Sequence, residues 1–231
     1  MKFFPRKRTK HTHGLRVTIA LSLLLVATLA AGYAASPSSS ATDDAWHNQF
    51  KAGVTPLGHS VATPEAHDTG HVTYTLHKPS SPTPDEEKLW AGIEKAVQAA
   101  VNIYNRNTSL KKHLDVTYNS GVPTADGNIN GSIRIGNSRN TRVILHEIGH
   151  CMGVGQHGNW LKLMVDGKWQ GKNANKLLQE YTKDPTAQLH GDRMHFWPYG
   201  LNYDTEVKSD EDLIRHAKIV EAIVKDLNEA K

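Results

Sequence analysis

The chain has 231 residues, 22% of them charged, with a formal net charge of +4 and a single cysteine, Cys151. One cysteine excludes an internal disulfide framework, and the length suits one domain with its own core. Six of the basic residues lie in the first 16 positions. Without them, 21 Lys and Arg stand against 23 Asp and Glu, so the charge balance gives no sign of a nucleic-acid-binding protein.

The first 34 residues have the pattern of a secretory signal peptide. The basic stretch is followed by an apolar run from Val17 to Ala31, and then by Gly32 and Ala34, small residues at the positions that a signal peptidase recognises. The run has 15 residues, fewer than the roughly 20 that span a bilayer, so a retained membrane anchor is the lesser alternative. We expect a secreted or periplasmic protein, cleaved near Ala34, with no stable membrane insertion unless the signal is kept.

Residues 35–69 are expected to form a poorly ordered linker, because they are rich in small residues, Pro and His and show no apolar period. A single domain is expected over residues 70–231. Its first strand is predicted at residues 71–78, where Val72, Tyr74 and Leu76 alternate with polar residues. Thr83 is a suitable N-cap for a long helix that ends near Asn105.

Shorter elements follow this helix. Strands are predicted at residues 113–118 and 128–135, helices at 141–152, 173–182 and 210–228, and an irregular, aromatic-rich segment at 184–204. Such an order of strands and helices predicts an α+β domain with a cleft beside the helix at 141–152.

That helix carries the sequence HEIGH. His146 and His150 are four residues apart, so both imidazoles project from one face and can reach one Zn²⁺ at about 2.0–2.1 Å each. Glu147 can instead contact a metal-bound water, whose pKa zinc lowers to about 7, and can take its proton. These residues are the parts needed to hydrolyse an amide. The alternative is a helix whose histidines only pack. The apolar run before His146, the export signal and Gly153 count against it.

From His146 onward the sequence resembles the metzincin zinc metallopeptidases, whose pattern is His-Glu-x-x-His-x-x-Gly-x-x-His followed by a turn that contains methionine. His146, Glu147, His150 and Gly153 match it position by position. The resemblance implies a domain with a small mixed sheet, a long helix, an active-site helix and a C-terminal helix. It also implies a zinc-dependent endopeptidase that acts on a peptide or protein substrate. We expect the enzyme to be a monomer.

The third metal ligand stays open, because the position of the family's third histidine holds Gln156. His157 could bind if the loop bulges by one residue, which its neighbouring glycines permit. His195, or its neighbour Asp192, could bind from the segment LHGDRMHFWPYGLNY. Glu180 could serve as a downstream helical glutamate does in the thermolysin-like group. We favour His195 slightly over His157, because it explains the unusual loop.

Other residues have two interpretations each. Met164 and Met194 are candidates for the turn below the metal, and either could equally belong to the core. Tyr199 and Tyr203 could donate to an oxyanion, although packing is the more common role. The segment DGNING matches half of a calcium loop, but its closing glutamate is missing and a tight turn is expected instead.

Two further functions compete with the endopeptidase. Gln156 at the third-ligand position motivates a secreted binding protein that keeps a degenerate, non-catalytic zinc site. The region of residues 43–70 is also short for an inhibitory pro-segment. An amidase acting on cell-wall peptides would use the same zinc chemistry on a different substrate.

Overall fold

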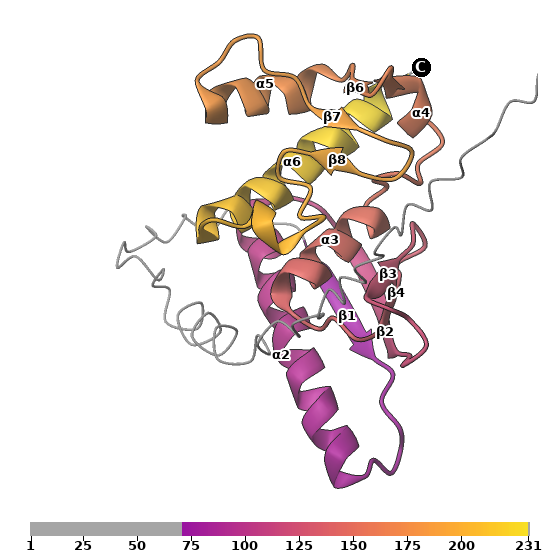
Figure 1. The fold of residues 1–231 in the computed structure, drawn as a ribbon. Coiled ribbons are helices and arrows are strands. Elements are labelled where there is room, and N and C mark those ends of the chain that lie inside the picture. Colours follow the sequence, from indigo (N-terminus) through magenta and orange to yellow (C-terminus); the bar gives the residue numbers. More distant parts are fainter. Residues whose placement is uncertain (1–70, 231) are drawn as a thin grey trace, which may run out of the picture. The chain divides into compact units, whose positions relative to one another are not determined.

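The computed structural model describes residues 71–230. The predicted signal peptide and linker, residues 1–34 and 35–69, therefore lie outside the described residues. Within the described part, the larger sheet has the spatial order β1 (Val72–Leu76), β2 (Lys112–Tyr118), β4 (Ser132–Ile135) and β3 (Ala125–Gly127) (Figure 1). The first three of these strands are parallel and β3 is antiparallel to β4, so the sheet is mixed.

The helix α2 (Pro84–Asn107) connects β1 to β2. Thr83 is its N-cap, as the sequence indicated, and also forms a capping box with Glu86. The apolar stripe of the helix is buried. At its other end the side chain of Asn105 bonds to both the N–H and the carbonyl of Val72, at 2.7 and 3.0 Å. These bonds hold the end of α2 against the start of β1.

One face of the larger sheet is covered by helices. Leu114, Val116, Ile133 and Ile135 are fully buried, whereas Thr73 and His113 on the opposite face are exposed. The covering helices are α2 and α3 (Thr141–Cys151), and both contact α6 (Asp210–Glu229). The fold is α+β with a small mixed sheet, a long helix and a C-terminal helix, as expected. None of the helices between residues 71 and 230 combines the length and apolar character that a membrane span requires.

The chain forms a second, smaller sheet after α3 and before α6. Its strands are β5 (Met164–Val165), β6 (Lys168–Trp169), β7 (His190–Gly191) and β8 (Phe196–Trp197), all antiparallel, with α4 (Trp160–Leu163) before them, α5 (Lys172–Thr182) between β6 and β7, and the 3₁₀ turn η1 (Asp204–Glu206) after them. The sequence predicted an irregular segment at residues 184–204, and this was wrong for β7 and β8. Strands of two residues are too short to show an alternating pattern.

The smaller sheet and α5 are anchored on α6 by one buried carboxylate. Asp226 is 4% exposed and accepts hydrogen bonds from Trp169 Nε1 at 2.9 Å, Asn173 N at 2.8 Å and Ala174 N at 3.1 Å. It therefore satisfies free N–H groups at the start of α5. A carboxylate at this end of a helix also interacts favourably with the positive end of the helix dipole.

Candidate metal centre

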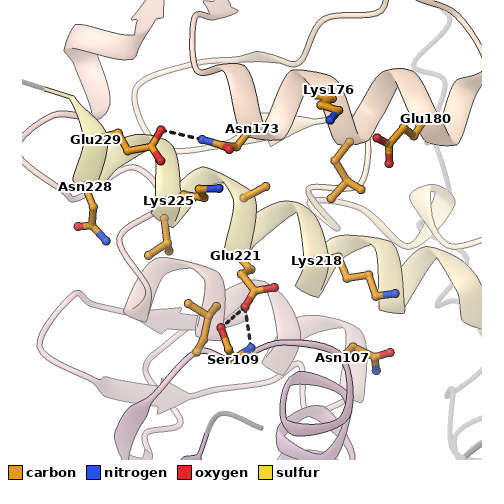
Figure 2. Close-up of a pocket in the computed structure, with 14 residues that line it drawn as sticks. Asn107, Ser109, Asn173, Lys176, Glu180, Lys218, Glu221, Lys225, Asn228 and Glu229 are labelled. Atoms are coloured by element: carbon orange, nitrogen blue, oxygen red, sulfur yellow. Dashed lines mark hydrogen bonds between the residues drawn. The ribbon is translucent and has the colours of Figure 1, made fainter. Parts of the chain in front are cut away.

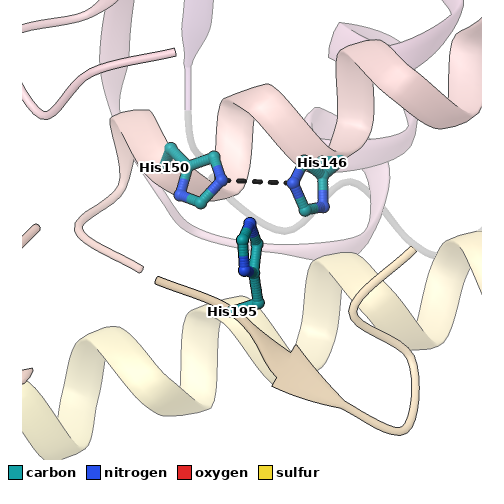
Figure 3. A group of neighbouring side chains, drawn as sticks. All are labelled: His146, His150 and His195. Atoms are coloured by element: carbon teal, nitrogen blue, oxygen red, sulfur yellow. Dashed lines mark hydrogen bonds between the residues drawn. The ribbon is translucent and has the colours of Figure 1, made fainter. Parts of the chain in front are cut away.

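Three histidines converge on one point between α3 and the smaller sheet. His146 and His150 come from α3, and His195 comes from the loop between β7 and β8. One ligand atom of each lies within 4.8 Å of the others, and their rings point toward one another (Figure 3). In residues 71–230 no other group of three or more His, Cys, Asp or Glu side chains meets this condition.

The two histidines of α3 present the same ring nitrogen to the site. His146 Nδ1 donates to Gly200 O at 2.8 Å and His150 Nδ1 donates to Val154 O at 2.9 Å. Carbonyl oxygens only accept, so the lone pair of each neutral ring lies on Nε2, and the two Nε2 atoms are 3.1 Å apart. Two nitrogens bound at 2.0–2.1 Å to a tetrahedral zinc ion would be about 3.3 Å apart.

Burial keeps both rings neutral. It lowers the pKa of His146 to about 3, and the neighbouring His150 adds to the shift. It also lowers the pKa of His150. Two lone pairs that face each other at 3.1 Å repel, and a divalent cation between them would remove this repulsion. The three histidines could therefore hold a divalent metal ion, and zinc, which the sequence suggested, is one of the metals that imidazole ligands suit.

His195 is held in place by Asp192. The Asp192 carboxylate accepts from the backbone N–H groups of Met194 and His195, both at 2.7 Å, and its Oδ2 lies 3.4 Å from His195 Nδ1. The ring centroid of His195 is 5.6 Å from those of both His146 and His150. Asp192 thus lies behind the ring and orients it, as a carboxylate partner of a metal-bound histidine does.

The other candidates for the third ligand lie elsewhere. His157 Nδ1 accepts from Asn159 N at 3.1 Å in the turn after α3, and His157 is not part of the histidine group. Glu180 lines a separate hollow of about 800 Å³ between α5, α6 and the end of α2 (Figure 2). The geometry favours His195.

Gln156 stands where the metzincin pattern has its third histidine, but its side chain bonds to backbone groups and not to the metal site. Its Oε1 accepts from Ile129 N at 2.9 Å and its Nε2 donates to Gly127 O at 2.8 Å, so it ties the loop after α3 to the β3–β4 hairpin. The residue before it, Gly155, has φ +71°, and a Cβ there would collide with the backbone of Met194. The loop therefore passes directly against the hairpin that carries His195.

We expect Gln156→Ala to lower the free energy of unfolding by about 1–3 kcal/mol, because two backbone groups lose their partner. Metal content should stay at the wild-type level. Urea unfolding and elemental analysis of the same samples would check both results. Gln170→Ala is the matched control, because the bond from Gln170 to Lys168 O is exposed. Loss of metal in Gln156→Ala alone would show that Gln156 takes part in the metal site.

Glu147 is the acidic group beside the histidines. It is 5% exposed and follows His146 directly on α3. Burial raises its pKa to about 7, and the negative charge of Asp126 acts in the same direction, against a backbone hydrogen bond from Gly127. A carboxyl group with a pKa near 7 can both accept and release a proton at neutral pH.

These groups line a cleft of about 410 Å³. One wall is the edge strand β3 with the preceding Thr124. The lining also includes exposed apolar side chains, with Met194 at 38%, Trp197 at 43% and Tyr203 at 71% exposure. Of the two tyrosines considered for an oxyanion, Tyr203 lines the cleft, whereas the hydroxyl of Tyr199 accepts a hydrogen bond from Arg215 at 2.9 Å.

Three remaining sequence features are structural. Cys151 is fully buried, and burial raises its pKa to about 12, as expected for a core residue. The expected strand at residues 128–135 begins only at Ser132, because the preceding residues form the β3–β4 turn. Basic side chains bind the oxygen atoms of that turn region: Arg134 pairs with the carboxylate of Asp126, and Lys112 donates to Ile129 O. This favours the turn over a calcium loop.

Residue types give no signal for some of the partners that hold the site. Gly200 and Val154 act through backbone carbonyls, which no side-chain pattern marks. The sequence named Asp192 only as an alternative metal ligand, whereas its side chain orients His195, three residues further along the chain. Comparisons of the chain with models of protein families, with characterised proteins and with solved structures found no match.

Proposed function

We propose that this chain is an exported, metzincin-like zinc endopeptidase in which His146, His150 and His195 hold the metal. The observation that carries the proposal is the convergence of three histidines beside a buried glutamate with a pKa near 7, at the base of an open cleft. Export is proposed from residues 1–34 alone.

The protein groups divide the chemistry between them. Zinc in this site would acidify a water molecule and polarise the scissile carbonyl. Glu147 takes the proton of the attacking water and then gives it to the leaving nitrogen, which its pKa near 7 permits in both directions. The carbonyls of Gly200 and Val154 and the carboxylate of Asp192 keep the three rings in place.

The walls of the cleft support a peptide substrate. Strand β3 lies at the edge of its sheet, so its outer backbone groups can pair with an extended chain. Met194, Trp197 and Tyr203, which line the same cleft, offer apolar contacts. A polypeptide supplies both backbone hydrogen-bonding groups and side chains for such a cleft.

The test is hydrolysis of a degenerate peptide mixture by the purified full chain, followed by mass spectrometry. We expect internal cleavage that a chelator abolishes and added zinc restores, with about one zinc ion bound per chain. Cell-wall fragments should be assayed in parallel, and cleavage of these fragments alone would instead indicate the amidase. Stoichiometric zinc without turnover of any substrate would contradict the proposal and leave the non-catalytic binding protein.

A further inference from the structure

A buried histidine also lies outside the metal group. His216 on α6 is 1% exposed. Its Nδ1 is 2.8 Å from Tyr199 O, and its Nε2 is 3.2 Å from the hydroxyl of Tyr104 and 3.0 Å from Leu145 O. The chemistry proposed above gives this residue no part, although it contacts the residue that precedes His146.

The protonation of His216 follows from its surroundings. Burial lowers its pKa to about 4, so the ring is neutral at pH 7. Both ring nitrogens face a carbonyl oxygen, with Nδ1 2.8 Å from Tyr199 O and Nε2 3.0 Å from Leu145 O. The neutral ring has one proton, and we assign it to Nδ1, which has the shorter contact and leaves Nε2 as the acceptor for a nearby hydroxyl. Nε2 then accepts from the hydroxyl of Tyr104. His216 is therefore a donor to the backbone of the loop that follows β8.

That loop carries the acceptor of His146. Gly200 follows Tyr199 directly, and its carbonyl accepts the Nδ1 proton of His146 at 2.8 Å. Tyr199 and Leu201 on either side have φ +65° and +58°, a left-handed conformation that non-glycine residues adopt only when neighbouring groups hold them there. A Cβ on Gly200 would collide with Phe196 O, so the loop folds tightly on itself.

The helix α6 holds this loop at more than one point. Besides the bond from His216, Arg215 donates to the hydroxyl of Tyr199 at 2.9 Å and lies 5.5 Å from the centre of its ring. The ring of Phe196 stacks on His216 with centroids 5.9 Å apart and an interplanar angle of 14°. The position of Gly200 O, and with it the ring orientation of His146, thus depends on α6.

We propose that His216 is a positioning residue for the metal centre: by donating to Tyr199 O it fixes the Gly200 carbonyl that orients His146. The inference rests on the proposed metal site. Partners of this kind fix the ring and tautomer of a ligand histidine, and removing one typically weakens metal binding about 10–100-fold. His216 does not bond to His146 itself. It acts on the acceptor of His146 through the backbone of the loop, because Tyr199 directly precedes Gly200.

Three substitutions in the full chain separate this role from packing. The side-chain amide of His216→Asn can replace the Nδ1 donor, whereas that of His216→Gln lies nearer the Nε2 position. His216→Phe keeps the ring and its stacking on Phe196 but has no donor. Tyr104→Phe is the control, because it removes a buried hydroxyl from the same cluster and leaves the bond to Tyr199 O. Circular dichroism checks the fold of each variant.

The measurements are the zinc dissociation constant, by competition with a chelator, and the visible absorption spectrum of the protein loaded with Co²⁺. We expect His216→Gln and His216→Phe to bind zinc about 10–100-fold more weakly with an altered Co²⁺ spectrum. His216→Asn and Tyr104→Phe should stay within a few-fold of wild type. If His216→Phe does not fold, the contrast between Asn and Gln decides alone.

Equal affinities and equal spectra for His216→Asn and His216→Gln would overturn the inference, because a packing role does not distinguish the two amides. In that case a wild-type chain that binds zinc leaves the proposed function intact. A wild-type chain that binds neither zinc nor cobalt overturns the metal site and this inference together.

Discussion

Replacing His195 with alanine is expected to empty the metal site, whereas His157→Ala should leave the metal content near that of wild type. His195 lies with His146 and His150 in one group, and His157 bonds to the backbone of its own turn. The loss of affinity should exceed about 100-fold, because even outer partners of a zinc ligand contribute about 10–100-fold.

Elemental analysis of the dialysed full chain would measure this result. His190→Ala is the matched control, because His190 is exposed on β7 of the same hairpin. The reverse pattern, with metal lost in His157→Ala and kept in His195→Ala, would show that the loop after α3 rearranges to close the site. Wild-type protein without metal would remove the basis of the peptidase proposal.

The sequence predicted the parts of the site that depend on local geometry. The spacing of His146 and His150 fixes them on one face of α3, whatever packs around the helix. The same holds for the start of α2, where Thr83 was predicted as the N-cap from the residues that follow it directly. The α+β class followed from the order of such elements.

The rest depends on contacts between distant segments. His195 reaches α3 through a hairpin of two-residue strands, and a strand of that length has no readable period. Gln156 could not be assigned its structural role without knowing that the β3–β4 turn lies beside it. Strand β3 itself was predicted as part of a turn region, because three residues next to a Gly- and Asn-rich turn resemble the turn.

Glu147→Gln is expected to lower kcat/KM by about 10²–10⁴-fold, the usual contribution of a general base, while zinc content stays at the wild-type level. The amide keeps the size of the side chain and can still accept from Gly127 N, but it cannot take the proton of water. Peptide cleavage and elemental analysis on the same preparation would measure both quantities. Glu180→Gln is the control, since Glu180 is exposed on α5 and is not part of the cleft lining. A fully active Glu147→Gln enzyme would refute the assigned role.

The same substitution should stabilise the metal-free protein at alkaline pH. Burial raises the pKa of Glu147 from 4.5 to about 7, so between these values the folded chain binds more protons than the unfolded chain. The free energy of unfolding therefore falls as pH rises from about 4.5 to 7 and stays at the lower value above pH 7. At 1.36 kcal/mol per pKa unit, the total loss is at most about 3 kcal/mol. Glu147→Gln lacks this loss. Urea unfolding of chelator-treated samples should show equal stability of variant and wild type at pH 4.5 and a more stable variant at pH 8. If the two proteins differ by the same amount at both pH values, Glu147 is not the group that titrates, and its role as the base near neutral pH loses its physical support.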